Sequence, residues 1–230
     1  MDVVWSRTRT FPLLPSTSPR LALSFVVLVA SCGGEAPRRA QPVAPAPASS
    51  ADLRGPEAFA SIADPGARSK AIFVEASKVL LHPRCVNCHP HDDRPRQRNL
   101  GLIHDPPVVR GPADHGAVGL ECSSCHQEKN VEGTRVPGAH DWHLAPREMV
   151  WLGRSPGAIC QQIKDPARNG NRTLAQIVEH SAHDGLVGWG WAPGADRTPA
   201  PGTQARFGAL MDAWAKTGAA CPDEIAGGKP

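Results

Sequence analysis

The chain contains two copies of the short pattern C-x-x-C-H, at residues 85–89 and at residues 122–126. In this pattern each of the two thiols can add across a vinyl group of a porphyrin and form a thioether. The adjacent imidazole can then reach the iron as an axial ligand. The sequence therefore predicts two c-type haems, each attached covalently. The residues expected to hold them are the cysteines Cys85, Cys88, Cys122 and Cys125 and the iron-binding histidines His89 and His126.

Two other kinds of site also use paired cysteines. A structural zinc site closes a tetrahedron with four thiolates, or with thiolates and imidazoles. Such a site does not need a histidine directly after the second cysteine of both pairs. A thioredoxin-like redox pair would need one C-x-x-C in a βαβ setting, and no such pattern surrounds either copy. The haem interpretation is therefore favoured over both alternatives.

An iron that carries electrons in a low-spin haem needs a sixth ligand, which proteins supply as histidine or methionine. Met211 falls in the apolar stripe of an expected helix, so Met149 is the plausible methionine. Histidines are more numerous, and we expect bis-histidine ligation. His104 is the first candidate, because a pair of prolines that begins two residues later would stiffen the backbone behind it. His143, which follows a tryptophan, is the second candidate.

The remaining histidines of the folded part are weaker candidates, since each could equally be solvated or hydrogen-bonded. His82, just before the first pattern, could form a hydrogen bond or bind iron. An iron without a sixth ligand would instead suit a haem peroxidase or reductase, so the sequence leaves open whether the chain is an enzyme. Tryptophans are expected to pack on the porphyrins. The weaker histidines are His115, His140, His180 and His183, and the tryptophans are Trp142, Trp151, Trp189 and Trp191.

The amino-terminal part indicates export. An apolar run at residues 21–30 follows several arginines and ends in small residues, as in a secretory signal peptide. It leads to Cys32 in a pattern that resembles the bacterial lipobox, so we expect Cys32 to be acylated. We predict a lipoprotein-type signal peptide at residues 1–31, a Pro- and Ala-rich tether at residues 32–53 and one domain at residues 54–230. The expected location is the periplasm, with a lipid anchor in a bacterial membrane. The zinc alternative would then be a zinc-binding lipoprotein.

The cysteine count also bears on the compartment. One cysteine for lipid and four for haem leave Cys160 and Cys221 of the seven. In an exported protein such a pair favours a disulfide, and two buried free thiols are the alternative. The formal net charge is +3, and no basic stretch is interleaved with aromatic residues. Nucleic acid is therefore not an expected partner.

Apolar periodicity predicts a mainly α fold with extensive irregular loops, in a single dihaem cytochrome c-like domain. Prolines and glycines interrupt the stretches 90–119 and 127–146, and we predict no strand. A haem can supply the apolar core that such loops lack. Helices are predicted at about residues 67–81, 155–164, 171–182 and 203–217, the last with an apolar stripe of Phe207, Leu210, Met211 and Trp214.

Four short segments carry a family resemblance: H-P-R-C-V-N-C-H-P at residues 82–90, W-H-L-A-P at 142–146, L-V-G-W-G-W at 186–191 and P-G-T-Q at 201–204. With them the chain resembles bacterial proteins described as isoquinoline 1-oxidoreductase subunits. The resemblance implies a periplasmic dihaem cytochrome c. It would receive electrons from a molybdenum hydroxylase of the isoquinoline 1-oxidoreductase or aldehyde dehydrogenase type and pass them to a respiratory acceptor. We find no molybdopterin site, ferredoxin-type cysteine set or Gly-rich dinucleotide loop in the sequence, so the chain is expected to transfer electrons rather than to catalyse.

Overall fold

Four helices carry most of the buried apolar side chains in the computed structural model, which describes residues 53–224 of the chain. The expected signal peptide, the acylated Cys32 and nearly all of the tether lie outside the described residues. The prediction of a mainly α fold is confirmed at this level. The four helices are α1 (Pro65–Leu80), α3 (Pro156–Lys164), α4 (Leu174–His183) and α6 (Gln204–Lys216). Each end lies within three residues of its predicted position.

Local capping explains where these helices begin. The side chain of the residue before each helix accepts a hydrogen bond from a backbone N–H of the first turn, which would otherwise lack a partner. Proline at the first position of α1 and of α3 fixes a helical φ where no N–H is needed. Thr173 forms a reciprocal capping box with Gln176 at the start of α4. The four capping residues are Asp64, Ser155, Thr173 and Thr203.

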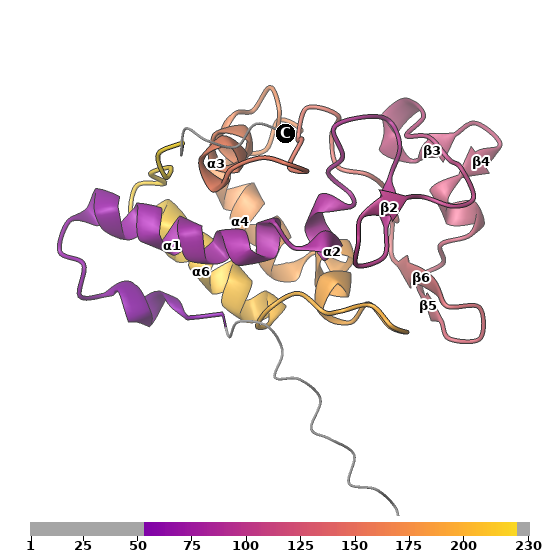
Figure 1. Ribbon diagram of the computed structural model, residues 1–230. Coiled ribbons are helices and arrows are strands. Elements are labelled where there is room, and N and C mark those ends of the chain that lie inside the picture. The colour runs from indigo at the N-terminus through magenta and orange to yellow at the C-terminus, as the bar shows by residue number, and fades with distance from the viewer. Residues whose placement is uncertain (1–52, 225–230) are drawn as a thin grey trace, which may run out of the picture. The chain divides into compact units, whose positions relative to one another are not determined.

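Helix α6 packs against both α1 and α4 and is the central helix of this group (Figure 1). The predicted stripe of α6 is buried, and the Trp214 ring lies 5.0 Å from the ring of Phe73 on α1. Against α4 the approach is closer, because a Cβ on Gly208 would come within 2.5 Å of the Ala182 Cβ. The two helices can therefore cross at this distance only while position 208 carries no side chain.

The long stretch between α1 and α3 contains three short antiparallel hairpins. Our prediction of no strand was wrong here. Each strand has only two to four residues, which is too few for an alternating pattern to appear in the sequence. The pairs are β1 (Arg96–Gln97) with β2 (Leu102–Ile103), β3 (Gly116–Ala117) with β4 (Leu120–Glu121), and β5 (Lys129–Val131) with β6 (Val136–Ala139).

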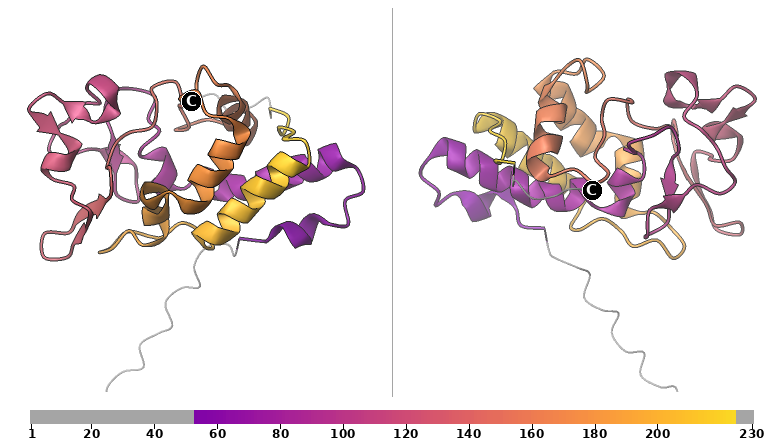
Figure 2. Two further views of the ribbon diagram at one scale, coloured as in Figure 1. Left: turned by 180° about the vertical axis from the view of Figure 1, so that it is seen from behind. Right: turned by 45° about the horizontal axis from the view of Figure 1, so that its top comes forward.

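The hairpins lie together on one side of the helices, beyond the short helix α2 (Pro83–Val86) (Figures 1 and 2). The C-x-x-C-H pattern at residues 122–126 belongs to this part and begins with the 3₁₀ helix η3 (Cys122–Ser124). The pattern at residues 85–89 begins within α2 and adjoins the helices. The two patterns thus belong to two different structural surroundings.

The remaining elements are short helical turns. α5 (Gly185–Gly188) and the 3₁₀ helix η4 (Trp189–Trp191) follow α4 directly, and Asp184 caps α5 by accepting the Val187 N–H at 3.0 Å. No helix in the described part is long and apolar enough to cross a membrane. The other two 3₁₀ helices described are η1 (Pro56–Phe59) and η2 (Pro112–Asp114).

Cys160 of α3 and Cys221, which follows α6, form a disulfide with a sulfur–sulfur distance of 2.09 Å. This is the pair that the cysteine count leaves over. The bond joins residues 61 positions apart, and it fixes the end of the chain after α6 to a helix of the core. Cys160 itself is fully buried within that core.

Candidate haem sites

The first C-x-x-C-H pattern folds as a short helical turn. The backbone N–H of Cys88 donates to the Cys85 carbonyl at 3.1 Å, and that of His89 donates to the Val86 carbonyl at 3.2 Å. The carbonyls of Cys88 and His89 accept in turn from Ala145, Trp151 and Leu152, at 3.1 to 3.2 Å. The pattern is therefore clamped by the segment that precedes α3.

His89 is oriented by two contacts. Its Nδ1–H donates to the backbone carbonyl of Met149 at 2.9 Å, and its ring stacks on Trp151 with centroids 3.4 Å apart and planes 5° from parallel. The ring borders a cavity, yet the surrounding chain desolvates it, and this burial lowers the pKa of His89 to about 3. A neutral imidazole whose Nδ1–H is engaged keeps its Nε2 lone pair free for a metal.

His126, in the second pattern, is held in the same way. Its Nδ1–H donates to the Pro137 carbonyl of β6 at 2.7 Å. Its ring stacks on Trp142, with centroids 4.4 Å apart and planes 7° from parallel, and burial lowers the pKa of His126. Two patterns in different surroundings therefore present a histidine with the same tautomer and the same tryptophan support.

The cysteines of the first pattern do not resemble a redox-active pair. Burial raises the pKa of the Cys85 thiol to about 12 and that of the Cys88 thiol to about 11. A disulfide oxidoreductase instead depends on a thiol whose pKa is lowered, so that it reacts as the thiolate. Neutral, half-buried thiols beside a cavity fit a role in holding a large apolar group.

The described cysteines also do not form a zinc tetrahedron. Within residues 53–224, one set of three or more ligating side chains lies close enough to hold a metal ion, with its ligand atoms all within 4.8 Å of one another. That set consists of His115, Asp141 and His143. It includes none of the thiols of either C-x-x-C-H pattern.

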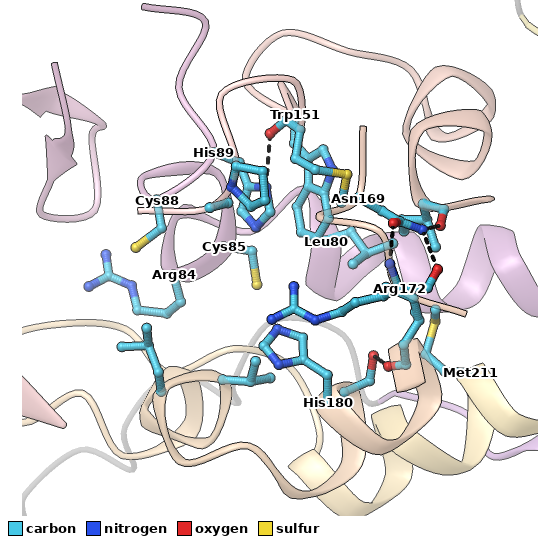
Figure 3. Close-up of a pocket in the computed structure, with 18 of the residues that line it drawn as sticks. Leu80, Arg84, Cys85, Cys88, His89, Trp151, Asn169, Arg172, His180 and Met211 are labelled. Carbon is cyan, nitrogen blue, oxygen red and sulfur yellow. Dashed lines mark hydrogen bonds between the residues drawn. The ribbon is translucent and has the colours of Figure 1, made fainter. Parts of the chain in front are cut away.

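A cavity adjoins the first pattern, with an empty volume of about 1010 Å³ including its opening to solvent (Figure 3). Its walls combine Cys85, Cys88 and His89 with apolar side chains of α3, α4 and α6 that belong to the core. The indole Nε1 of Trp151, also in the wall, is buried and has no partner among the described residues. A large planar apolar group in this cavity would therefore complete the core between the helices.

His180 of α4 faces His89 across this cavity (Figure 3). The Arg172 side chain extends between Cys85 and His180 in the same view. His180 Nδ1 lies 3.3 Å from the Asp184 carboxylate, and this hydrogen bond lowers the pKa of Asp184 to about 2. The carboxylate is therefore ionised at neutral pH and fixes the His180 ring, whose Nε2 remains free.

A second cavity, with an empty volume of about 1830 Å³ including its opening, adjoins the second pattern. His104 and His126 both line it, and their ring centroids are 5.9 Å apart with planes at 70°. Two imidazoles bound to opposite faces of one iron have centroids roughly 6 Å apart, given iron–nitrogen bonds of about 2 Å. His104 Nδ1 is engaged with the Pro106 carbonyl at 2.9 Å, which leaves Nε2 of this first-ranked candidate free.

His143, the second-ranked candidate, lies in the wall of both cavities. Its Nδ1 is engaged with the backbone carbonyl of Asp141, and its ring stacks on His115 with centroids 4.8 Å apart. It remains a candidate for either iron. Both His143 and His180 line the first cavity with His89.

The other candidates lie away from both cavities or serve the fold. His82 caps α2 by accepting the Arg84 N–H at 3.3 Å, and Met211 is buried in the core stripe. Met149 binds His89 through its carbonyl, and so belongs to the His89 side of the first cavity. His140 and His183 are exposed and adjoin Glu128 and Glu179. Trp191 lines neither cavity and instead packs 5.8 Å from the ring of Phe207.

His180 was a weaker candidate than His143 in the sequence, and the structure places it in the wall of the first cavity. Its position near the end of an amphipathic helix does not reveal which way the imidazole points, because that depends on how α4 packs against α6. One signal was available: Asp184 lies four residues after His180, and residues at that spacing meet on one helix face. A carboxylate paired with a histidine is a common support for a metal ligand.

The two cavities share part of their walls. Arg84, Cys88, His143 and Trp189 line both of them, and the charge of Cys122 acts on the Cys88 thiol. The two C-x-x-C-H patterns therefore face adjoining spaces, although 37 residues separate Cys85 from Cys122 in the sequence.

Comparisons with protein-family models, curated proteins and solved structures produced no match to this chain.

Proposed function

We propose that the chain is a dihaem c-type cytochrome that exchanges single electrons with a redox partner protein. One observation carries this proposal. Both C-x-x-C-H patterns present, beside a cavity, a histidine whose Nδ1–H donates to a backbone carbonyl and whose ring stacks on a tryptophan. A bound haem iron supplies a one-electron ferric–ferrous couple. The residues described would fix the group at two thiols and one imidazole nitrogen.

The distal ligands are assigned from the same geometry. His104 serves the haem of the second cavity, since its ring lies 5.9 Å from that of His126. His180 serves the haem of the first cavity, where it faces His89, and His143 is the competing candidate. Bis-histidine ligation fills both axial positions and therefore favours electron transfer over chemistry at the iron.

The shared wall supports passage of electrons between the two sites. Cys88, which would carry one haem, lines the cavity of the other. Two redox centres in adjoining cavities are suited to receive an electron on one side of the protein and release it on the other. The enzyme alternative, a haem peroxidase or reductase, would need one iron with an open sixth position.

We also propose a cellular location and redox partners for this cytochrome. The disulfide between Cys160 and Cys221 favours an oxidising compartment such as the periplasm, and the lipobox-like pattern before Cys32 supports attachment to a membrane by lipid. The family resemblance supports a molybdenum hydroxylase as the electron donor and a respiratory acceptor downstream.

Expression of the full chain together with a c-type haem maturation system tests the proposal. We expect the purified protein to carry two haem masses that survive denaturation, and to give a pyridine haemochrome spectrum. The ferric protein should be low-spin. A colourless protein that contains zinc would establish the zinc-binding alternative. Two attached haems with a high-spin, peroxide-reactive spectrum would instead favour the enzyme alternative.

A further inference from the structure

Arg84 is a buried cation between the two cavities. The residue is 5% exposed, and its Nη2 donates to the Arg98 carbonyl at 2.7 Å and to Asn99 Oδ1 at 3.0 Å. Its Nε is buried and has no partner in the described part of the chain. Both acceptors are neutral. A buried charge without an ionised partner is costly, so the site is electrostatically incomplete.

A second arginine adds to the positive charge of the same cavity. Arg197 lines the second cavity with Arg84, and its guanidinium donates to the carbonyls of Pro193 at 3.2 Å and Arg135 at 2.6 Å. Burial and the charge of Arg197 lower the pKa of Arg84, which shows that the two cations are close enough to repel. The carboxylate of Asp196, whose charge acts on both arginines, is paired with Arg135 at 2.7 Å.

The lining of the second cavity as a whole is also positive, with five arginines against three carboxylates. Two guanidiniums that line the same cavity fit a bidentate anion such as a carboxylate. A c-type haem brings two such carboxylates, its propionates.

The position of Arg84 decides which haem provides them. Arg84 directly precedes Cys85 in α2 and lines the first cavity together with Cys85 and Cys88. It therefore lies at the thioether edge of the first haem. The propionates leave a haem from the edge opposite its thioethers, so those of the first haem point away from Arg84.

We propose that Arg84 and Arg197 bind the propionates of the haem attached at Cys122 and Cys125. This inference rests on the dihaem function proposed above. Paired with propionate, the two cations offset its negative charge and so stabilise the ferrous form relative to the ferric form. The thioether edge of one haem would then lie beside the propionate anchor of the other.

The test uses the full chain with both haems attached and compares Arg84→Gln, Arg197→Gln and Arg84→Lys by optical redox titration. We expect each glutamine variant to lower the midpoint potential of the same one of the two haems, and the lysine variant to restore part of the loss. Arg154→Gln, which alters an exposed arginine outside both cavities, is the matched control and should leave both potentials unchanged.

Two outcomes overturn the inference. One is that both glutamine variants keep two haems with the potentials of the control. The other is that they lower the potentials of different haems. If Arg84→Gln does not accumulate, the less buried Arg197→Gln decides alone, and an unchanged potential in that variant is sufficient to reject the proposal. Failure of the wild-type chain to attach haem would instead reject the proposed function, so the two failures are distinguishable.

Discussion

The two candidate proximal histidines show how a backbone carbonyl can decide which imidazole nitrogen is left free for a metal. An imidazole has two nitrogens, and donation by Nδ1–H leaves Nε2 as the acceptor. Met149 and Pro137 supply the carbonyls for His89 and His126. Because these acceptors belong to the main chain, the tautomer does not depend on the side chain at either position.

The distal assignments predict a spectroscopic result. His104→Ala and His180→Ala should each convert about half of the haem to the high-spin state, since each removes one axial bond from one iron. The double variant should convert nearly all of it. Visible and electron paramagnetic resonance spectra of the ferric protein provide the measurement. His140→Ala alters an exposed histidine and should leave the spectrum unchanged. Conversion of half the haem by His143→Ala, with His180→Ala silent, would reassign the first iron to His143.

His82 predicts a pH dependence of stability. Burial, assisted by the charge of Arg84, lowers the pKa of His82 to about 4 from an ordinary value of 6.5. Between about pH 6.5 and pH 4, His82 is therefore protonated in the unfolded chain but neutral in the folded chain. The free energy of unfolding decreases as the pH falls through this range. Replacement of His82 by Asn keeps an acceptor at the cap of α2 and removes the titration. Urea unfolding of the haem-bound protein should then depend less steeply on pH in this window than for the wild type, whereas equal slopes would contradict the assigned pKa.

At the residue scale, the sequence identifies candidate ligands that belong to a local pattern. It does not reveal candidates whose position depends on how the helices pack. The cysteines and proximal histidines lie within five-residue patterns, and His104 lies beside a proline pair that accepts its Nδ1–H. His180 reaches its cavity only because α4 is pressed against α6, and no local pattern contains that contact.

The contact between α4 and α6 depends on the glycine at position 208, which has no side chain. Helix α4 carries His180 and α6 lies in the core, so the distance between the two helices sets how far the imidazole extends into the cavity. Gly208 and Ala182 fix that distance, since an added Cβ would lie 2.5 Å from the Ala182 Cβ. We therefore assign Gly208 a positional role in the first site, although it touches no ligand.

Gly208→Ala should separate the two helices. Overpacking of this kind typically lowers the free energy of unfolding by about 1–3 kcal/mol, and the shift of α4 should raise the high-spin fraction of one haem. Ala209→Ser adds one atom at the adjacent, exposed position of α6 and is the control for a change of residue size alone. Denaturation and the ferric spectrum of both variants provide the measurements. A Gly208→Ala protein with wild-type stability and spectrum would show that α4 and α6 are not held at this distance.

The elements themselves were predictable to different degrees. Helices α1, α3 and α6 are recognisable because a capping residue, an N-terminal proline or a buried stripe identifies each in its own sequence. The hairpins are not, because strands of two to four residues form where turns bring the chain back on itself. All eight described non-glycine residues with positive φ lie outside α1, α3, α4 and α6.

At the scale of the whole molecule, the described chain has one helical core and one loop-rich part, and a cavity lies against each. The first cavity is walled by core side chains of α3, α4 and α6, so a haem bound there would pack as part of the core. The second is walled mostly by the hairpins and the loops between them. We therefore expect loss of the haem at Cys122 and Cys125 to loosen the hairpins more than the helices.

The disulfide is expected to stabilise the helical core. Cys160 lies in α3, and Cys221 follows α6, which contacts α1 and α4. A loop of this length limits the unfolded chain by about 4 kcal/mol in the loop-entropy model. Replacement of both cysteines by Ala should therefore lower the free energy of unfolding by about 2–4 kcal/mol, as measured by urea denaturation of the haem-bound protein.

The wild type with its disulfide reduced is the matched control, because it keeps both sulfur atoms in the core and lacks only the bond. If the bond acts through the unfolded chain, the reduced wild type and the double-Ala variant should lose similar stability, and both should keep the low-spin spectrum. A much larger loss in the double-Ala variant would assign the effect to the packing of Cys160, which is fully buried. A high-spin spectrum in the reduced protein would show instead that the bond holds α3 against the first cavity, whose wall includes Ile163 of that helix.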